Sequence, residues 1–209
     1  MGFGDRFTRA LHRLFNKKSV KIGIYGPPNA GKTTLATRIA RDWGMSVEGT
    51  ISPIPHETRS AEHIKNVEII AGNGSSIRID IVDTPGVTTK VDYLEFMEYG
   101  MGGDDAMVRA REATEGVAEA MHWLREDIDG VIYMMDATED PFIQVNIMMI
   151  GIIESRNLPV LIAANKIDLP DAKPQRIKKA FPQHHFVAIS CREELQIFDL
   201  YEEIVRVFR

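Results

Sequence analysis

The stretch Gly26-Pro-Pro-Asn-Ala-Gly31-Lys32-Thr33 decides the fold, and we call it the phosphate loop. It follows the apolar run Val20-Lys-Ile-Gly-Ile-Tyr25 and has the spacing G-x-x-x-x-G-K-[ST], whose glycines let backbone N–H groups curl around a phosphate. Lys32 brings a positive charge to the β- and γ-phosphates, and the Thr33 hydroxyl is placed to ligate Mg²⁺. A helix expected over 32–43 points its positive end at the same phosphates. The stretch therefore predicts a strand, a phosphate-binding loop and a helix.

A second motif, Asn165-Lys-Ile-Asp168, comes at the end of the apolar run Pro159-Val-Leu-Ile-Ala-Ala164. A carboxylate at Asp168 can accept hydrogen bonds from both N1–H and the 2-amino group of guanine, whereas adenine offers neither donor at this edge. Asn165 is expected to tie the base to the phosphate loop, and the stem of Lys166 to lie over the base. The motif indicates a guanine nucleotide rather than an adenine nucleotide.

The segment Asp83-Thr-Pro-Gly86 ends the strand expected over 77–82. Asp83 is placed to hold Mg²⁺ through a water, and the Gly86 amide to bond a γ-phosphate, a contact that exists with GTP and not with GDP. Thr58, in the polar loop after the first helix, is the candidate for a second Mg²⁺ hydroxyl. Ser190-Cys191-Arg192, after the strand expected over 185–189, is expected to close over guanine O6 through backbone N–H groups.

Together these motifs resemble the translation-factor-related GTPases, and among them the G domain of Era and its archaeal relatives. The resemblance covers residues 19–209 and implies an α/β fold, a three-layer P-loop NTPase G domain that binds GTP and slowly hydrolyses it to GDP with Mg²⁺. The KH domain that follows in Era is missing from the sequence, so the role of Era on ribosomal RNA is not implied. The site residues implied are, for catalysis, Lys32, Thr58 and Gly86; for nucleotide binding, Asn29, Ala30, Gly31, Lys32, Thr33, Thr34, Asn165, Lys166, Asp168, Ser190, Cys191 and Arg192; and, for Mg²⁺, Thr33, Thr58 and Asp83.

The alternation of strands and helices predicts a mainly parallel six-stranded sheet, covered on both faces, with one antiparallel strand. Every nucleotide motif then falls at the carboxyl end of a strand, where ligands bind in such sheets. Strands are expected near 20–25, 66–71, 76–82, 130–135, 159–164 and 185–189, and helices near 32–43, late in 87–128, and over 141–156, 174–180 and 193–208.

The composition fits one such domain. A chain of 209 residues with 44% hydrophobic content can bury a full core without disulfides, and its one cysteine, Cys191, predicts a reducing, cytoplasmic setting. No stretch is apolar enough to span a bilayer, and charges interrupt residues 1–15, so we expect no signal peptide. The net charge of -5 argues against wholesale nucleic-acid binding by the globular part.

Two positions near the phosphates bear on the rate of hydrolysis. Val87 follows Gly86, where Ras-type enzymes use a glutamine to orient the attacking water, and a valine side chain cannot do this. We therefore expect slow intrinsic hydrolysis. In Era-like and tRNA-modification GTPases an asparagine at the position of Asn29 is associated with a K⁺ ion that bridges the phosphates. Asn29 either holds such an ion or only stabilises its own loop.

Residues 1–18 form a basic arm outside the G domain. On a helical wheel its large apolar side chains fall within about 120°, and its basic ones lie opposite; the apolar ones are Phe3, Phe7, Leu11, Leu14 and Phe15. Such an amphipathic helix fits a peripheral contact with an anionic membrane through residues 3–15, docking on RNA or a partner groove, or packing on the G domain itself.

Three functions remain open at this stage. The favoured one is a hydrolysing molecular switch that acts on an unknown protein or ribonucleoprotein effector, for example in ribosome or RNA-protein assembly. The alternatives are a nucleotide-gated membrane-attachment module and a GTP sensor with negligible hydrolysis.

Overall fold

The computed structural model describes residues 19–44, 62–88, 93–98, 100, 102–126 and 128–209. Thr58 and the basic arm, residues 1–18, lie outside the described residues. The predicted N-terminal amphipathic helix is therefore not tested here, and neither is the assignment of a second Mg²⁺ hydroxyl.

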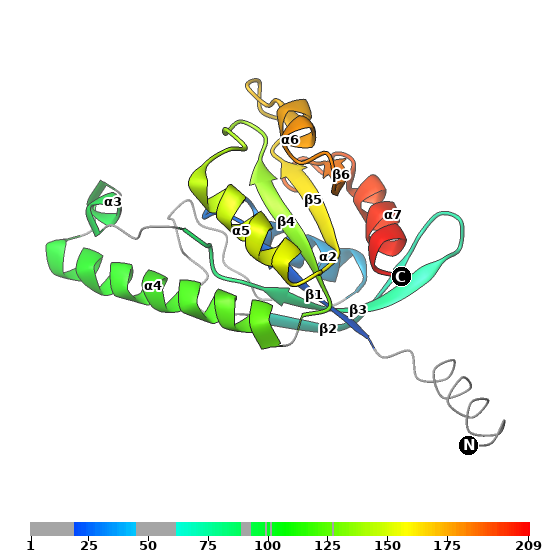
Figure 1. The fold of residues 1–209 in the computed structure, drawn as a ribbon, viewed down its shortest axis with the longest axis horizontal. Helices are drawn as coiled ribbons and strands as arrows, with labels where there is room; N and C mark the ends of the chain where they lie inside the picture. The colour runs from blue at the N-terminus through cyan, green and yellow to red at the C-terminus, as the bar shows by residue number, and fades with distance from the viewer. Residues whose placement is uncertain (1–18, 45–61, 89–92, 99, 101, 127) are drawn as a thin grey trace, which may run out of the picture.

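The described strands form one 6-stranded sheet in the order β2-β3-β1-β4-β5-β6 (Figure 1). β2 and β3 pair antiparallel, and every other neighbouring pair is parallel. The predicted sheet with one antiparallel strand is confirmed. The strands are β1 (Val20–Tyr25), β2 (Glu62–Ile70), β3 (Ser76–Asp83), β4 (Gly130–Asp136), β5 (Val160–Asn165) and β6 (His185–Ala188).

Helices cover both faces of this sheet and make a three-layer fold (Figure 1). On one face α2 and α7 bury Leu35 and Leu200 against β1 and its neighbours. On the other face α4, α5 and α6 bury Leu124, Met149 and Ile177. The helices are α2 (Lys32–Asp42), α3 (Tyr93–Glu98), α4 (Gly103–Glu126), α5 (Gln144–Ser155), α6 (Pro174–Ala180) and α7 (Ile197–Phe208). None of the described helices has the length and apolar character needed to cross a membrane.

Two elements begin four residues away from the predicted start, and both differences have a local cause. β2 begins at Glu62 instead of 66, because it continues past a register shift between Ile64 and Val67. α7 begins four residues later than expected. Glu194 and Gln196 have left-handed φ values of 60° and 56°, which a helix cannot accommodate.

Candidate functional site

The predicted nucleotide motifs gather at the carboxyl ends of β1, β3 and β5 and in the loop after β6. The phosphate loop leaves β1 and enters α2, and the Asp83–Gly86 segment leaves β3 on the neighbouring strand. The Asn165–Asp168 motif leaves β5, and residues 190–196, which we call the base loop, follow β6. One end of the sheet therefore carries all the described candidate residues.

Glycine is needed at two positions of the phosphate loop. Gly26 and Gly31 have φ values of 148° and 96°, which side-chain-bearing residues rarely adopt. A Cβ atom at Gly26 would overlap the carbonyl oxygen of Met134, and one at Gly31 would overlap the Asn165 side chain. Asn29 also has a positive φ, 59°, and lies exposed on the loop. The loop thus follows a path from β1 to α2 that requires glycine at these two positions.

Lys32 is buried, with 6% of its surface exposed. Its Nζ donates to the carbonyl oxygen of Pro27 at 2.8 Å, so the ammonium group bonds the backbone of the phosphate loop to which it belongs. Burial lowers the pKa of Lys32 to about 8, although the nearby charge of Asp83 works in the opposite direction. A phosphate would give this buried cation an anionic partner.

The two described Mg²⁺ candidates meet beside this lysine. Thr33 Oγ1 donates to Asp83 Oδ2 at 2.7 Å, and Asp83 is 1% exposed. A hydroxyl and a carboxylate are hard oxygen ligands, which Mg²⁺ prefers, and the ion commonly takes phosphates as further ligands. The pair fits an Mg²⁺ ion that is shared with a nucleotide. Thr34 lies half-buried one residue further along α2.

Hydrogen bonds hold the Asp83–Gly86 segment and the residue after it against β1 and the phosphate loop. Buried Thr84 donates from Oγ1 to the Ile24 carbonyl at 2.7 Å, and the Val87 N–H donates to the Gly26 carbonyl at 3.1 Å. A Cβ atom at Gly86 would lie 2.9 Å from Pro28 Cα. Val87 is fully buried in the apolar layer that includes Leu124. It offers no polar group to an attacking water.

Asn165 connects the two ends of the site. Its Nδ2 donates to the carbonyl of Ala30 in the phosphate loop at 2.9 Å, and its Oδ1 accepts from the Cys191 N–H at 3.0 Å. The side chain is 4% exposed. Because one amide bonds both loops, it holds them at a set separation.

Lys166 forms an ion pair that the sequence reasoning missed. Its Nζ lies 2.5 Å from Asp136 Oδ2, at the end of β4. Burial alone would raise the pKa of Asp136, but hydrogen bonds from Lys166 and Thr138 outweigh this and hold it below its usual value. Asp136 ends an apolar strand in the way that Asp83 does, and this pattern could have pointed to it. The pair fixes the lysine stem beside half-buried Asp168.

The base loop is closed by its own backbone. Ser190 and Leu195 exchange two hydrogen bonds of 3.1 Å, and the Ser190 Oγ accepts from the Glu193 N–H at 3.0 Å. Burial raises the pKa of the Cys191 thiol to about 12, so this residue offers its backbone rather than a thiolate. Arg192 is exposed, and its Nε lies 3.5 Å from Glu193 Oε1. Ser190 and Cys191 therefore come close to the Asn165–Asp168 motif, while the Arg192 side chain lies in solvent.

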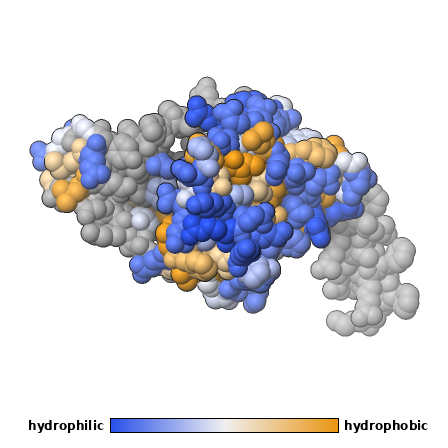
Figure 2. Space-filling model, turned by 90° about the horizontal axis from the view of Figure 1, so that it is seen from above, coloured by the Kyte–Doolittle hydropathy of each residue, from blue (hydrophilic) through white to orange (hydrophobic). Residues whose placement is uncertain are grey.

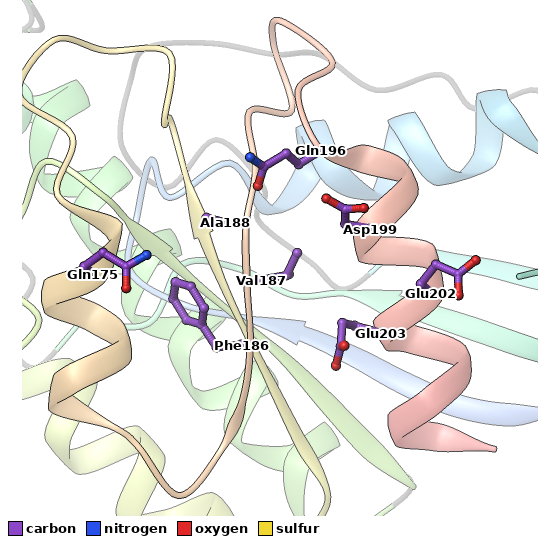
Figure 3. Close-up of a pocket in the computed structure, with 8 residues that line it drawn as sticks. All are labelled: Gln175, Phe186, Val187, Ala188, Gln196, Asp199, Glu202 and Glu203. Atoms are coloured by element: carbon purple, nitrogen blue, oxygen red, sulfur yellow. The ribbon is translucent and has the colours of Figure 1, made fainter. Parts of the chain in front are cut away.

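A separate pocket lies at the sheet edge on β6, between α6 and α7 (Figure 3). Three carboxylates line it, and two already have structural partners: Glu202 accepts from the Gly72 N–H at 2.5 Å, and Glu203 lies 3.3 Å from His185. Gln196 lines its rim and ends the base loop. None of the predicted nucleotide residues lines it, so this pocket is not the candidate site.

Sequence comparison identifies relatives among GTP-binding proteins. The family model described as "50S ribosome-binding GTPase" matches residues 21–166. Translation initiation factor IF-2 of Rhodospirillum rubrum is 23% identical over 217 residues, which cover 98% of this chain and 20% of that protein. The same factor from Methylocella silvestris is 26% identical over 163 residues, which cover 78% of this chain and 14% of that protein.

Solved structures give the same result. An Aquifex aeolicus Era variant bound to GDP and aluminium fluoride has a TM-score of 0.66 and 25% identity, over 92% of this chain and 57% of that one. Era bound to MgGDPNP and nucleotides 1506–1542 of 16S ribosomal RNA has a TM-score of 0.60 and 24% identity, over 93% and 58%. An NFeoB variant of S. thermophilus with GDP and aluminium fluoride has a TM-score of 0.61 and 18% identity, over 91% and 65%.

The chain spans about a fifth or less of the IF-2 proteins and less than two thirds of the solved chains. The family match nevertheless covers more than half of this chain, from the first residues of β1 through the phosphate loop and Asp83–Gly86 to Lys166. The expected likeness to an Era-type G domain is confirmed. The chain belongs to the family of 50S ribosome-binding GTPases.

Proposed function

We propose that this protein binds GTP and slowly hydrolyses it to GDP with Mg²⁺, and that the exchange of the two nucleotides switches its contact with an effector. The observation that carries the proposal is the double hydrogen bond of Asn165, at 2.9 Å to the phosphate loop and 3.0 Å to the base loop. Because one side chain bonds both loops, it supports a nucleotide whose phosphates lie at the phosphate loop and whose base lies at the base loop.

In this proposal, different residues bind the phosphates, the guanine base and Mg²⁺. Backbone N–H groups of Ala30, Gly31 and Lys32 take the phosphates at the start of α2, and buried Lys32 exchanges its contact with Pro27 for phosphate oxygens. Asp168 accepts from the guanine edge, and the Lys166 stem, held by Asp136, covers the ring. Thr33 and Asp83 hold Mg²⁺, which, when bound, neutralises charge on the phosphates.

Slow hydrolysis follows from the surroundings of Gly86. Its amide is offered to a γ-phosphate close to Pro28, whereas the next side chain, Val87, is buried and cannot orient a water. Loss of the γ-phosphate would release the Gly86 contact, which connects nucleotide state to the segment that follows.

The effector we propose is a protein or ribonucleoprotein reached in the cytoplasm. The family description and the complex of Era with 16S ribosomal RNA support a ribosomal assembly as the setting. The net charge of -5 favours a protein surface over bare RNA as the direct contact of the globular part.

A filter assay with radiolabelled GTP, followed by release of phosphate, tests the proposal. We expect Mg²⁺-dependent binding and slow turnover, both lost in Lys32→Ala because the phosphates lose their buried cation. Arg111→Gln, at an exposed ion pair on α4, serves as the matched control. Binding without turnover would favour the GTP-sensor alternative, and equal activity of Lys32→Ala would contradict the phosphate cradle.

A further inference from the structure

Arg38 is a nearly buried charge next to the candidate site, although it belongs to none of the nucleotide motifs. It lies in the second turn of α2, after the phosphate loop, and its side chain is 10% exposed. A buried guanidinium is costly unless it is paired. The partners of Arg38 therefore show what this charge does.

The closest partner lies in the base loop. Arg38 Nη2 donates to Glu194 Oε1 at 2.5 Å, although the two residues are 156 positions apart in the chain. Glu194 has a left-handed φ of 60°, so the loop is strained where the arginine holds it. The hydrogen bond also holds the pKa of Glu194 below its usual value, and the carboxylate stays charged.

The other side of Arg38 is anchored in the fold. Its Nη1 lies 3.6 Å from Asp42 Oδ1, and Asp42 Oδ2 accepts from the Tyr201 hydroxyl of α7 at 2.7 Å. Trp43 packs edge-on against the Tyr201 ring, with the centroids 5.9 Å apart. The guanidinium is therefore paired with Asp42 of its own helix, which α7 holds through Tyr201, and Glu194 is the member of the network that belongs to a loop.

We propose that Arg38 is a positioning residue for guanine recognition. By holding Glu194 it keeps the base loop in the conformation in which the backbone N–H groups next to Cys191 reach the 6-oxo group of guanine. The inference rests on the proposed function. It adds a contact from the phosphate-binding helix to the base loop, independent of the one through Asn165.

Two nucleotides separate this role from a merely structural one. GDP carries the 6-oxo group, and 2-aminopurine riboside diphosphate keeps the phosphates and the 2-amino group but lacks both the 6-oxo group and N1–H. Each variant is therefore compared with the unaltered chain on the same nucleotide, so that the weaker contact of the analogue with Asp168 is common to both. We expect Arg38→Gln and Glu194→Gln each to speed GDP dissociation about three- to tenfold, the range of a partly exposed ion pair with a charged hydrogen bond. The analogue should change by less than about twofold, since it makes no contact with the loop at position 6.

Two further variants help to decide between the outcomes. The double variant should be no worse than either single one, because both remove the same contact. Arg111→Gln removes an exposed ion pair of 3.2 Å on α4 and should leave both nucleotides unchanged. Glu194 is 63% exposed, so Glu194→Gln tests the contact even if Arg38→Gln unfolds.

Equal losses for GDP and the analogue would overturn the inference, because a general loosening of the fold would not distinguish a 6-oxo group. An unchanged GDP dissociation rate in Glu194→Gln would overturn it as well. If the unaltered chain binds no guanine nucleotide, the proposed function fails first, and that result is distinct from either of these.

Discussion

The phosphate end of the candidate site is made mainly of backbone, whereas the base end is made of side-chain ties. At the phosphate end, Gly26 and Gly31 adopt φ values that other residues avoid, and neighbouring atoms leave no room for a Cβ. At the base end, the side chain of Asn165 and the Arg38–Glu194 ion pair connect the base loop, which its own backbone closes, to the rest of the fold. The phosphate end depends on glycines that lack a side chain. The base end depends on side chains that come from distant parts of the sequence.

The two ends are therefore sensitive to different kinds of substitution. A backbone cradle keeps its N–H groups in place when a single side chain is lost. A loop held by side chains loses its geometry one contact at a time. On the face seen from above, the described residues are mostly hydrophilic, with apolar patches between them (Figure 2).

The largest expected effect is at the base end. Asp168→Asn removes the acceptor for two guanine donors, so GTP affinity should fall by about 100-fold or more. Xanthosine triphosphate should now be preferred, because the new amide can donate to its 2-oxo group. Competition binding with both nucleotides measures the exchange.

Asp171→Asn is the matched control, because this exposed aspartate lies in the same loop region and makes no part of the proposed contact. It should leave both affinities unchanged. Undiminished GTP affinity in Asp168→Asn would contradict the assignment of Asp168 to guanine recognition. It would leave the assignment of the phosphate loop unaffected.

The next largest effect tests the tie between the two ends. Asn165→Ala leaves the Ala30 carbonyl and the Cys191 N–H without their bonds and should lower the free energy of unfolding by about 1–3 kcal/mol. Asn165→Asp keeps an acceptor for Cys191 and loses the donor to Ala30, so it should spare the base loop. Urea unfolding and GDP affinity measure both variants.

If the two variants weaken GDP binding equally and to the full extent, the bond to Ala30 alone would carry the connection. Asn73→Ala, which alters an exposed asparagine whose Oδ1 accepts hydrogen bonds from Ser75 in the hairpin turn, is the control for loss of an asparagine.

The same contrast explains how much the sequence could predict. The sheet, its antiparallel strand and the phosphate loop follow from periodicity and from glycine spacing, which are local properties. The Arg38–Glu194 pair joins residues 156 positions apart, and no local sequence pattern around Glu194 predicts this contact. The start of α7 was placed too early for the same reason, since the left-handed residues before Ile197 are glutamate and glutamine rather than glycine.

Asn29 offers a smaller effect, at the phosphate end. If its exposed carboxamide holds K⁺ against the phosphates, hydrolysis should be at least about tenfold faster in K⁺ than in Na⁺, because charge near the β–γ bridge stabilises the transition state. Asn29→Ala should lose the K⁺ response and keep GDP affinity, since Lys32 and the backbone remain. Phosphate release in matched salts measures both.

A control for backbone strain is needed, because Asn29 has a φ of 59°. Asn29→Gly removes the carboxamide at no conformational cost and should behave like Asn29→Ala. Equal rates in K⁺ and Na⁺ for the unaltered chain would rule the ion out, and an activating partner that supplies an arginine would then be the better explanation.

The smallest effect on the nucleotide concerns the basic arm. Deleting residues 1–18 should leave GDP affinity unchanged, because both ends of the site are built from residues after Ser19, whose hydroxyl bonds Asp80 at 2.6 Å at the start of β1. Attachment to anionic vesicles or to a captured partner should be lost instead.

The outward face of α5 gives a second test of the arm: Ile147 and Met148 are 52% and 37% exposed, and the helix carries no charge before Glu154. If the arm packs on this face, the deletion should raise binding of an apolar dye, and Ile147→Glu in the deleted chain should reverse that rise. Unfolding on deletion would show that the arm completes the core, and it would end the recruitment hypothesis.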